Sequence, residues 1–118
     1  ARPACIGAPG DRLCDASLVV QIYRDDGCNR RFDRAWDRSL AGVPVTIRYG
    51  NGHAESQLTS DGGVALFGGI NLPDGMLLEV AADLPPDRPL CYNSVSRPRL
   101  DAADFAPMDY ARVTFRSR

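Results

Sequence analysis

The chain has 118 residues, a net charge of −1 and 44% hydrophobic residues. This length suits one domain, and the balanced charge argues against a broad basic face for nucleic acid. All 14 basic residues are Arg, and the absence of Lys excludes Schiff-base chemistry and a P-loop. No apolar run approaches the roughly 20 residues of a membrane span. With a single His, His53, and no nucleophile motif, we expect a protein that is not an enzyme.

The chain is predicted to begin with an irregular arm followed by one domain. Residues 1–17 are rich in Pro, Gly and Ala and have no hydrophobic period. The domain spans 18–118 and opens with the apolar, β-branched strand Leu18–Arg24. A charged loop, Asp25–Ser39, follows. Strict alternation over Val43–Tyr49 then predicts a strand with one buried face.

The rest of the chain alternates short strand candidates with turn signals such as Gly50-Asn51-Gly52 and Ser60–Gly63. The expected elements are strands over Ala54–Thr59, Val64–Phe67, Met76–Ala82, Leu90–Ser96 and Tyr110–Phe115, with a short helical turn or loop over Asp101–Pro107. About seven short strands with regular turn signals and no amphipathic helix predict an all-β sandwich.

Four cysteines, an even number in a short chain, predict disulfides formed in an oxidising compartment. Four cysteines allow three pairings; we expect Cys5–Cys14 as a local clip and Cys28–Cys91 as a bridge across the fold. Their spacing lacks the C-x2-C pairs of a zinc site. The chain begins Ala-Arg-Pro-Ala-Cys, without an initiator Met or an apolar signal core. This start is typical of a secreted or cell-surface protein whose signal peptide has been removed.

Three segments resemble, in order and spacing, the B-type repeat domains of bacterial surface adhesins. They are Leu40–Val45 (LAGVPV), Thr59–Phe67 (TSDGGVALF) and Leu72–Gly75 (LPDG). The family includes the serine-aspartate-rich repeat proteins and the collagen-adhesin B domains, and the resemblance implies an Ig-like or transthyretin-like β-sandwich stapled here by disulfides. Gly42 and Gly63 each precede a strand at a tight turn, so we expect a positive φ at both.

The resemblance also brings two chemical expectations. An isopeptide bond or a lysine-linked pilus is excluded, because the chain has no Lys. Calcium is the one cofactor to consider, since the family carries an acidic calcium loop. The residues able to act as its ligands are Asp25, Asp26, Asp33 and Asp37. The positions between them fall on Cys28 and Arg30, which do not bind calcium, so the alternative is a solvated loop of Arg and Asp.

The same loop holds the candidate interface residues. Phe32 and Trp36 lie four residues apart among Arg30, Arg31 and Arg34. Aromatic residues and Arg are enriched at protein interfaces, so we interpret the aromatic pair as anchors and the three Arg as a polar rim. The alternatives are that the Trp caps the sandwich or stacks on a sugar.

These observations lead to two hypotheses of function. The first is a non-enzymatic extracellular structural protein, a subunit of a prokaryotic surface assembly such as a filament, sheath or envelope complex. Its partners are proteins, including further copies of itself, and its last strand, Tyr110–Phe115, pairs within its own sheet or with a neighbour. The second is a secreted module that recognises carbohydrate or a host protein through the Trp36 loop.

Overall fold

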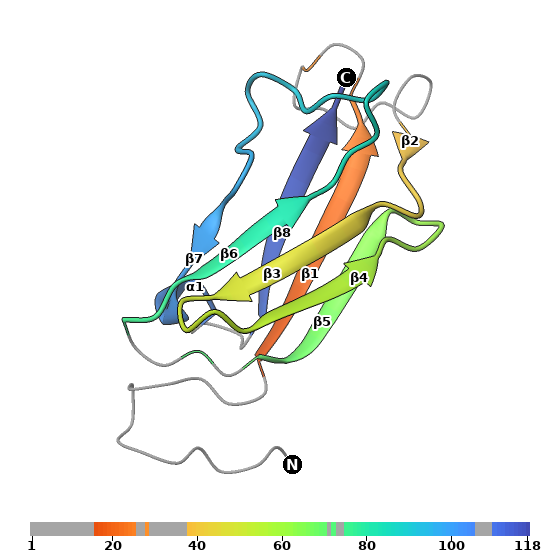
Figure 1. The fold of residues 1–118 in the computed structure, drawn as a ribbon. Helices are drawn as coiled ribbons and strands as arrows, with labels where there is room; N and C mark the ends of the chain where they lie inside the picture. Colours follow the sequence, from red (N-terminus) through yellow and green to blue (C-terminus); the bar gives the residue numbers. More distant parts are fainter. Residues whose placement is uncertain (1–15, 26–27, 29–37, 71, 73–74, 106–109) are drawn as a thin grey trace.

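The structure of the chain, a computed structural model, describes residues 16–25, 28, 38–70, 72, 75–105 and 110–118. Its elements follow one another along the chain (Figure 1). The strands are β1 (Ala16–Arg24), β2 (Arg38–Ser39), β3 (Pro44–Tyr49), β4 (Ala54–Leu58), β5 (Val64–Ile70), β6 (Leu78–Ala82), β7 (Arg99–Leu100) and β8 (Tyr110–Ser117), with the short helix α1 (Ala102–Phe105) before β8.

The strands form two four-stranded sheets that face each other (Figure 1). In the first sheet, β1 is central: β8 pairs with it in parallel over Ser17–Arg24, and antiparallel β5 and β2 follow one another along its other edge. The second sheet is antiparallel throughout, in the order β4-β3-β6-β7. The all-β class predicted from the sequence is therefore confirmed.

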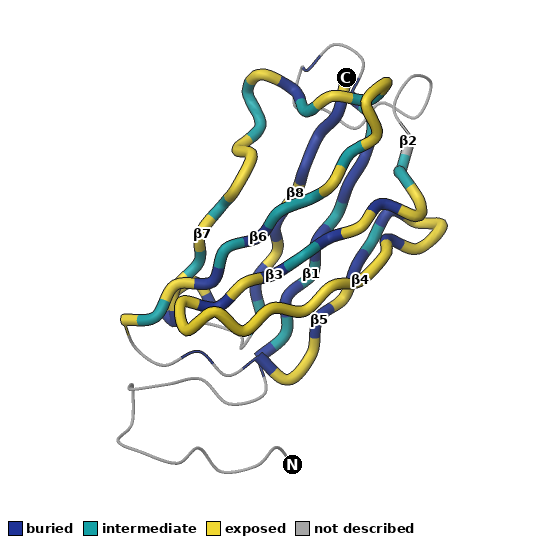
Figure 2. The backbone as a smooth tube through the Cα atoms, viewed as in Figure 1, coloured by how far each residue is buried: buried dark blue, intermediate teal, exposed yellow. Residues whose placement is uncertain are grey.

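Alternation along the strands builds the core between the sheets. In β1, Leu18, Val20 and Ile22 are fully buried, and in β3 so are Val45 and Ile47. The intervening residues are more exposed, so buried and exposed segments alternate along the strands (Figure 2). Each fully buried side chain of this size stabilises the fold by about 1.5–3 kcal/mol.

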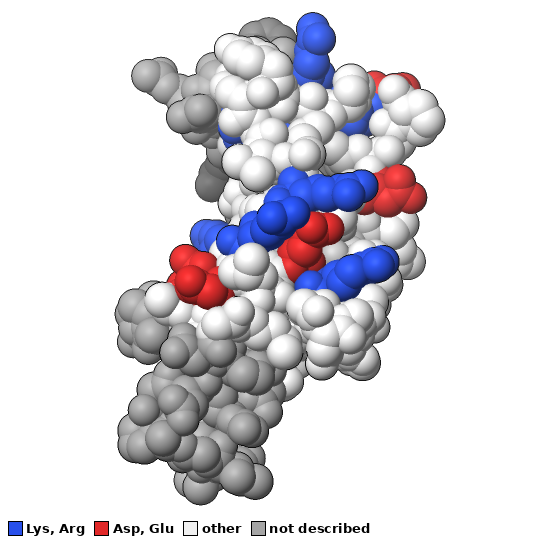
Figure 3. All heavy atoms as spheres, turned by 60° about the vertical axis from the view of Figure 1, so that its left-hand side comes forward, with Lys and Arg blue, Asp and Glu red and all other residues white. Residues whose placement is uncertain are grey.

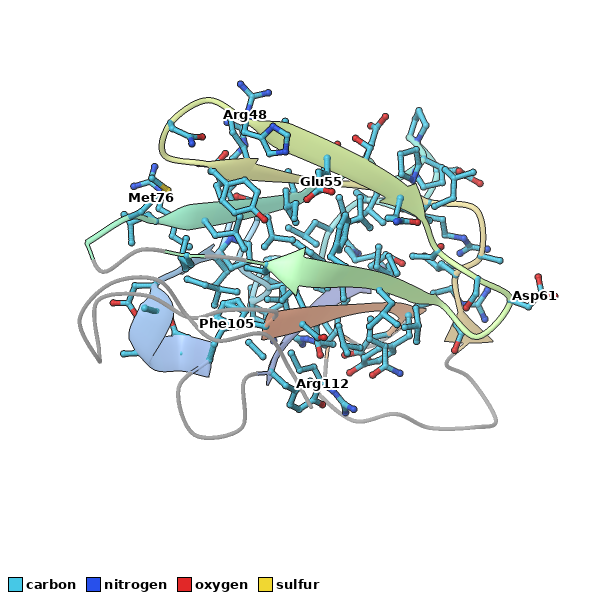
Figure 4. The ribbon with its side chains drawn as sticks, turned by 90° about the horizontal axis from the view of Figure 1, so that it is seen from below. Arg48, Glu55, Asp61, Met76, Phe105 and Arg112 are labelled. Atoms are coloured by element: carbon cyan, nitrogen blue, oxygen red, sulfur yellow. A yellow bond between two sulfur atoms is a disulfide. The ribbon has the colours of Figure 1, made fainter. Side chains whose placement is uncertain are left out.

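The helical turn expected over Asp101–Pro107 is present as α1. The Asp101 carboxylate accepts a hydrogen bond from the Ala103 N–H at 3.0 Å, and the Asp104 carboxylate accepts one from the Asp101 N–H at 2.8 Å. This reciprocal capping satisfies N–H groups that a helix start leaves open. It also holds Phe105, which is fully buried, in the core at the end of the sandwich (Figure 4).

The structure corrects several predicted elements; β5 and β8, for example, extend to Ile70 and Ser117. Leu90–Ser96 is not a strand: Leu90 forms an isolated bridge to Ser117, a turn follows, and the strand of this region is β7. The reason is that Cys91 is anchored by a disulfide and by a hydrogen bond to the Arg116 carbonyl, which bends the chain there. The predicted loop Asp25–Ser39 contains the two-residue strand β2, which pairs with the end of β1. The strand β1 begins at Ala16 and not at the predicted Leu18.

Candidate functional site

The base of the charged loop is a buried polar cluster around a disulfide. Cys28 and Cys91 are bonded, as predicted, with a sequence separation of 63. The Asn93 amide donates a hydrogen bond to the Cys28 carbonyl at 2.8 Å, and the Arg116 guanidinium donates one to the Asn93 carbonyl at 2.8 Å. Together these contacts tie β8 and the turn after Cys91 to the start of the loop. The predicted Cys5–Cys14 pair lies outside the described residues.

Asp25, a predicted calcium ligand, directly follows β1 and faces a basic side chain of β8. Its side chain is fully buried, and a carboxylate oxygen lies 3.5 Å from Nη1 of Arg116, whose side chain is 11% exposed. A positive charge thus already faces this carboxylate. The part of the chain that the structure describes holds no cluster of three metal-binding side chains. Asp26, Asp33 and Asp37 lie outside it, so calcium stays a prediction.

The predicted interface residues all lie outside the described residues as well. They are Phe32, Trp36, Arg30, Arg31 and Arg34. Their role as anchors and rim therefore stays a prediction.

A second feature, on the outer face of the second sheet, was not predicted. The register places Thr46 of β3 opposite Ala81 of β6 and Arg48 opposite Glu79, all pointing away from the core. Two adjoining hollows of about 520 and 320 Å³ share Thr46, Ala81 and Arg97 in their walls. We call them together the arginine crevice.

The connection between β6 and β7 forms the far wall of the larger hollow. Its prolines, Pro85, Pro86 and Pro89, fix φ and favour an extended path. The Arg118 N–H donates a hydrogen bond to the Pro89 carbonyl at 2.7 Å, which anchors this path to the end of β8. Inside the hollow, Leu84, Leu90 and the buried Phe115 present apolar surface. The larger hollow is therefore apolar at its base.

The mouth of the crevice is charged. Glu79 pairs with Arg99 at 3.5 Å, both being partly exposed. Arg48 and Arg97 have no ion-pair partner within 4.0 Å among the residues described. Figure 3 shows basic side chains gathered on one face of the molecule, with acidic side chains between and beside them. With Asp83 also on the rim, two Arg (Arg48 and Arg97) and two acidic residues (Glu79 and Asp83) line the crevice, and Arg99 pairs with Glu79 at its margin.

A further titratable group lies at the end of β3. Burial first, and then the charge of Glu55 and a hydrogen bond to it, raise the pKa of the Tyr49 hydroxyl above 10.0. The ring of His53 stacks obliquely on Tyr49, with centroids 5.5 Å apart. Tyr49 is therefore a neutral hydrogen-bond partner at neutral pH.

The outer edge of β5 offers backbone groups for pairing. The Ile22 N–H donates a hydrogen bond to the Gly63 carbonyl at 2.8 Å, and hydrogen-bonded residue pairs alternate with non-hydrogen-bonded pairs along an antiparallel ladder. The backbone N–H and C=O groups of Ala65 and Phe67 therefore face β1, whereas those of Leu66 point away from the sheet. No described strand pairs with this edge. The Leu66 side chain is 60% exposed, and β5 carries no charged residue. Natural edge strands are usually protected by charges, so this edge favours pairing.

Comparison with known proteins gives no match: no family model, curated protein or solved structure matches the chain. The resemblance to adhesin B-type domains therefore rests on its three sequence segments alone and stays a prediction. Within the described residues, no helix has the length and apolar character needed to cross a membrane.

Proposed function

We propose that the chain is a non-enzymatic extracellular structural protein, a subunit of a prokaryotic cell-surface assembly that acts through protein–protein contacts. The observation that carries this proposal is the uncharged outer edge of β5, with Leu66 exposed beside backbone groups that no described strand pairs with. The buried Cys28–Cys91 disulfide supports an oxidising, extracellular setting.

The strand order supports a transthyretin-like fold over an Ig-like one. Leaving out the two-residue β2, one sheet holds the first, fourth and seventh strands, and the other holds the second, third, fifth and sixth. A constant-type immunoglobulin domain instead groups strands ABED and CFG. The positive φ of Gly42, 71°, and of Gly63, 73°, also agrees with the turns expected from the adhesin resemblance. We therefore propose the transthyretin-like member of the two folds.

The choice of β5 over β4 as the contact follows from charge. β4 is also an edge strand, but it carries the charged residue Glu55. Pairing two copies of β4 would bring both Glu55 carboxylates into the new contact, and directly opposite each other if the strands paired about Glu55, which destabilises a cross-strand pair. Two copies of β5 paired about Leu66 would bring apolar side chains together and form new backbone hydrogen bonds. A second copy of this chain, docked edge to edge, is the partner we propose.

Size-exclusion chromatography with light scattering tests this proposal. The wild-type protein is expected to associate as its concentration rises, and Leu66→Arg is expected to remain monomeric because it places like charges opposite each other. Leu58→Arg is the matched control: Leu58 lies on the β4 edge and is 64% exposed, against 60% for Leu66. A wild-type protein that stays monomeric at high concentration would overturn the assembly role. Association that resists Leu66→Arg would leave assembly standing and move the contact to another surface.

The alternative function, recognition of carbohydrate or a host protein through the Trp36 loop, stays a prediction because Trp36 lies outside the described residues. Binding to a glycan array that is lost in Trp36→Ala would favour this alternative. It is independent of the β5 edge.

A further inference from the structure

We propose that the arginine crevice binds an acidic peptide, an extended segment in which an apolar side chain neighbours a carboxylate. The larger hollow, about 520 Å³, falls within the range of about 300–1,000 Å³ typical of ligand sites. Its base is lined by Leu84, Leu90 and Phe115 and so accepts an aliphatic side chain. This site lies apart from the β5 edge and does not depend on the assembly role.

Arg97 connects the apolar and charged parts of the crevice, because it lines both hollows. An Arg guanidinium binds a carboxylate through two parallel hydrogen bonds, a strong and directional contact. Arg48 lines the smaller hollow and is exposed. Neither side chain is held by an acidic residue of the described chain. A ligand that seats its apolar side chain at the base can therefore direct its carboxylate to Arg97.

The acidic residues of the crevice decide between possible anionic ligands. Glu79 lies between the strands that carry Arg48 and Arg99, and Asp83 stands at the rim. A polyanion with a charge on every unit would bring some of its charges close to these two carboxylates. A peptide with spaced carboxylates avoids that repulsion, and its apolar side chains use surface that a sugar acid would leave unfilled. We therefore assign the crevice to an acidic peptide and not to an acidic polysaccharide.

Fluorescence anisotropy with a labelled peptide of alternating leucine and aspartate tests the assignment. Charge-assisted hydrogen bonds contribute about 1.5–3 kcal/mol, so Arg97→Gln is expected to weaken binding by about tenfold or more. Arg48→Gln is expected to weaken it in the same direction. The matched control is Arg112→Gln, since Arg112 is exposed on the opposite face of the sandwich from Arg48 (Figure 4). The circular dichroism spectra and melting temperatures of the variants establish that each one folds.

Each remaining outcome bears on the proposal. Binding that falls when asparagine replaces aspartate in the peptide, and that Arg112→Gln leaves unchanged, supports it. Equal binding of the asparagine peptide, equal losses in Arg97→Gln and Arg112→Gln, or no binding of the aspartate peptide would overturn it. A uronate oligosaccharide that binds as tightly as the peptide would also overturn it, in favour of a saccharide.

Discussion

Gly63 is the position where one added methyl group should most disturb this fold. Its φ is 73°, in the left-handed region, and a Cβ built there would lie 2.5 Å from the Ile22 carbonyl oxygen and 2.8 Å from Cβ of Ser39. Gly42 has nearly the same φ, 71°, but an added Cβ there meets nothing within 4 Å. The two glycines therefore share the conformational cost of an alanine and differ in the steric one.

The magnitudes follow from this difference. A left-handed conformation costs an L-residue about 1–2 kcal/mol, and the lower entropy of the unfolded alanine chain partly offsets this cost. Gly42→Ala should therefore lower the free energy of unfolding by about 1 kcal/mol. In Gly63→Ala the new methyl group meets the Ile22 carbonyl oxygen and Cβ of Ser39, and no change of side-chain rotamer moves either atom. Moving them disturbs the hydrogen bond from the Ile22 N–H to the Gly63 carbonyl, 2.8 Å. Because the steric strain and the weakened hydrogen bond add to the conformational cost, Gly63→Ala should lower the free energy of unfolding by about 3–4 kcal/mol.

Urea unfolding followed by far-ultraviolet circular dichroism measures both losses. For a domain of this size, a loss of 1 kcal/mol lowers the melting temperature by about 4 °C, so the two variants should differ by about 10 °C. An unchanged slope of free energy against urea would show that both variants still unfold as wild type does. Equal losses in Gly63→Ala and Gly42→Ala, within about 0.5 kcal/mol, would refute the close packing of Gly63 against β1.

Two further predictions concern the disulfide and Tyr49. Replacing Cys28 and Cys91 together by alanine opens a loop with a separation of 63, and the chain-entropy relation gives a loss of about 4 kcal/mol in the free energy of unfolding. A loss below about 1 kcal/mol in urea titration would contradict that account. Because the folded pKa of Tyr49 is raised, the stability that it contributes is complete below pH about 10 and is lost as the pH rises through the folded value. Glu55→Gln removes a charge that raises this pKa, so an absorbance titration of tyrosinate should show it lowered; an unchanged curve would contradict the cause given.

The parts of the fold that depend on local pattern were predictable. Alternation identified the buried face of β3, apolar β-branched composition identified β1 as a strand, and the turn chemistry of Gly42 and Gly63 indicated the positive φ that both adopt. Leu90–Ser96 has the composition of a strand, yet Tyr92 is 87% exposed and Val95 is 67% exposed. A composition rule cannot foresee this, because the disulfide and the hydrogen bond of Cys91 to β8 decide the path.

The site divides in the same way. The outward direction of Thr46 and Arg48 follows from the alternation of β3, so the part of the arginine crevice that β3 forms could be predicted from the sequence. The other half depends on Arg97, which a long proline-rich connection brings back beside β6. The charge that faces Asp25 also depends on the tertiary fold: the sequence predicts a calcium ligand there, which stays a prediction, and the fold places Arg116 beside its carboxylate.

The parallel pairing of β1 with β8 has a kinetic consequence. Ser17 pairs with Tyr110, so the central strand of the first sheet meets one of its two long partners only near the far end of the chain. The chain must lose the entropy of closing this large loop before the β1–β8 contacts can stabilise it, and folds rich in distant contacts therefore form slowly. A chain that emerges from its amino end, during synthesis or export, holds the apolar strand β1 without this partner until residues 110–117 have emerged. During that interval β1 is open to strands from other chains, and the rate of chain emergence sets how long the interval lasts.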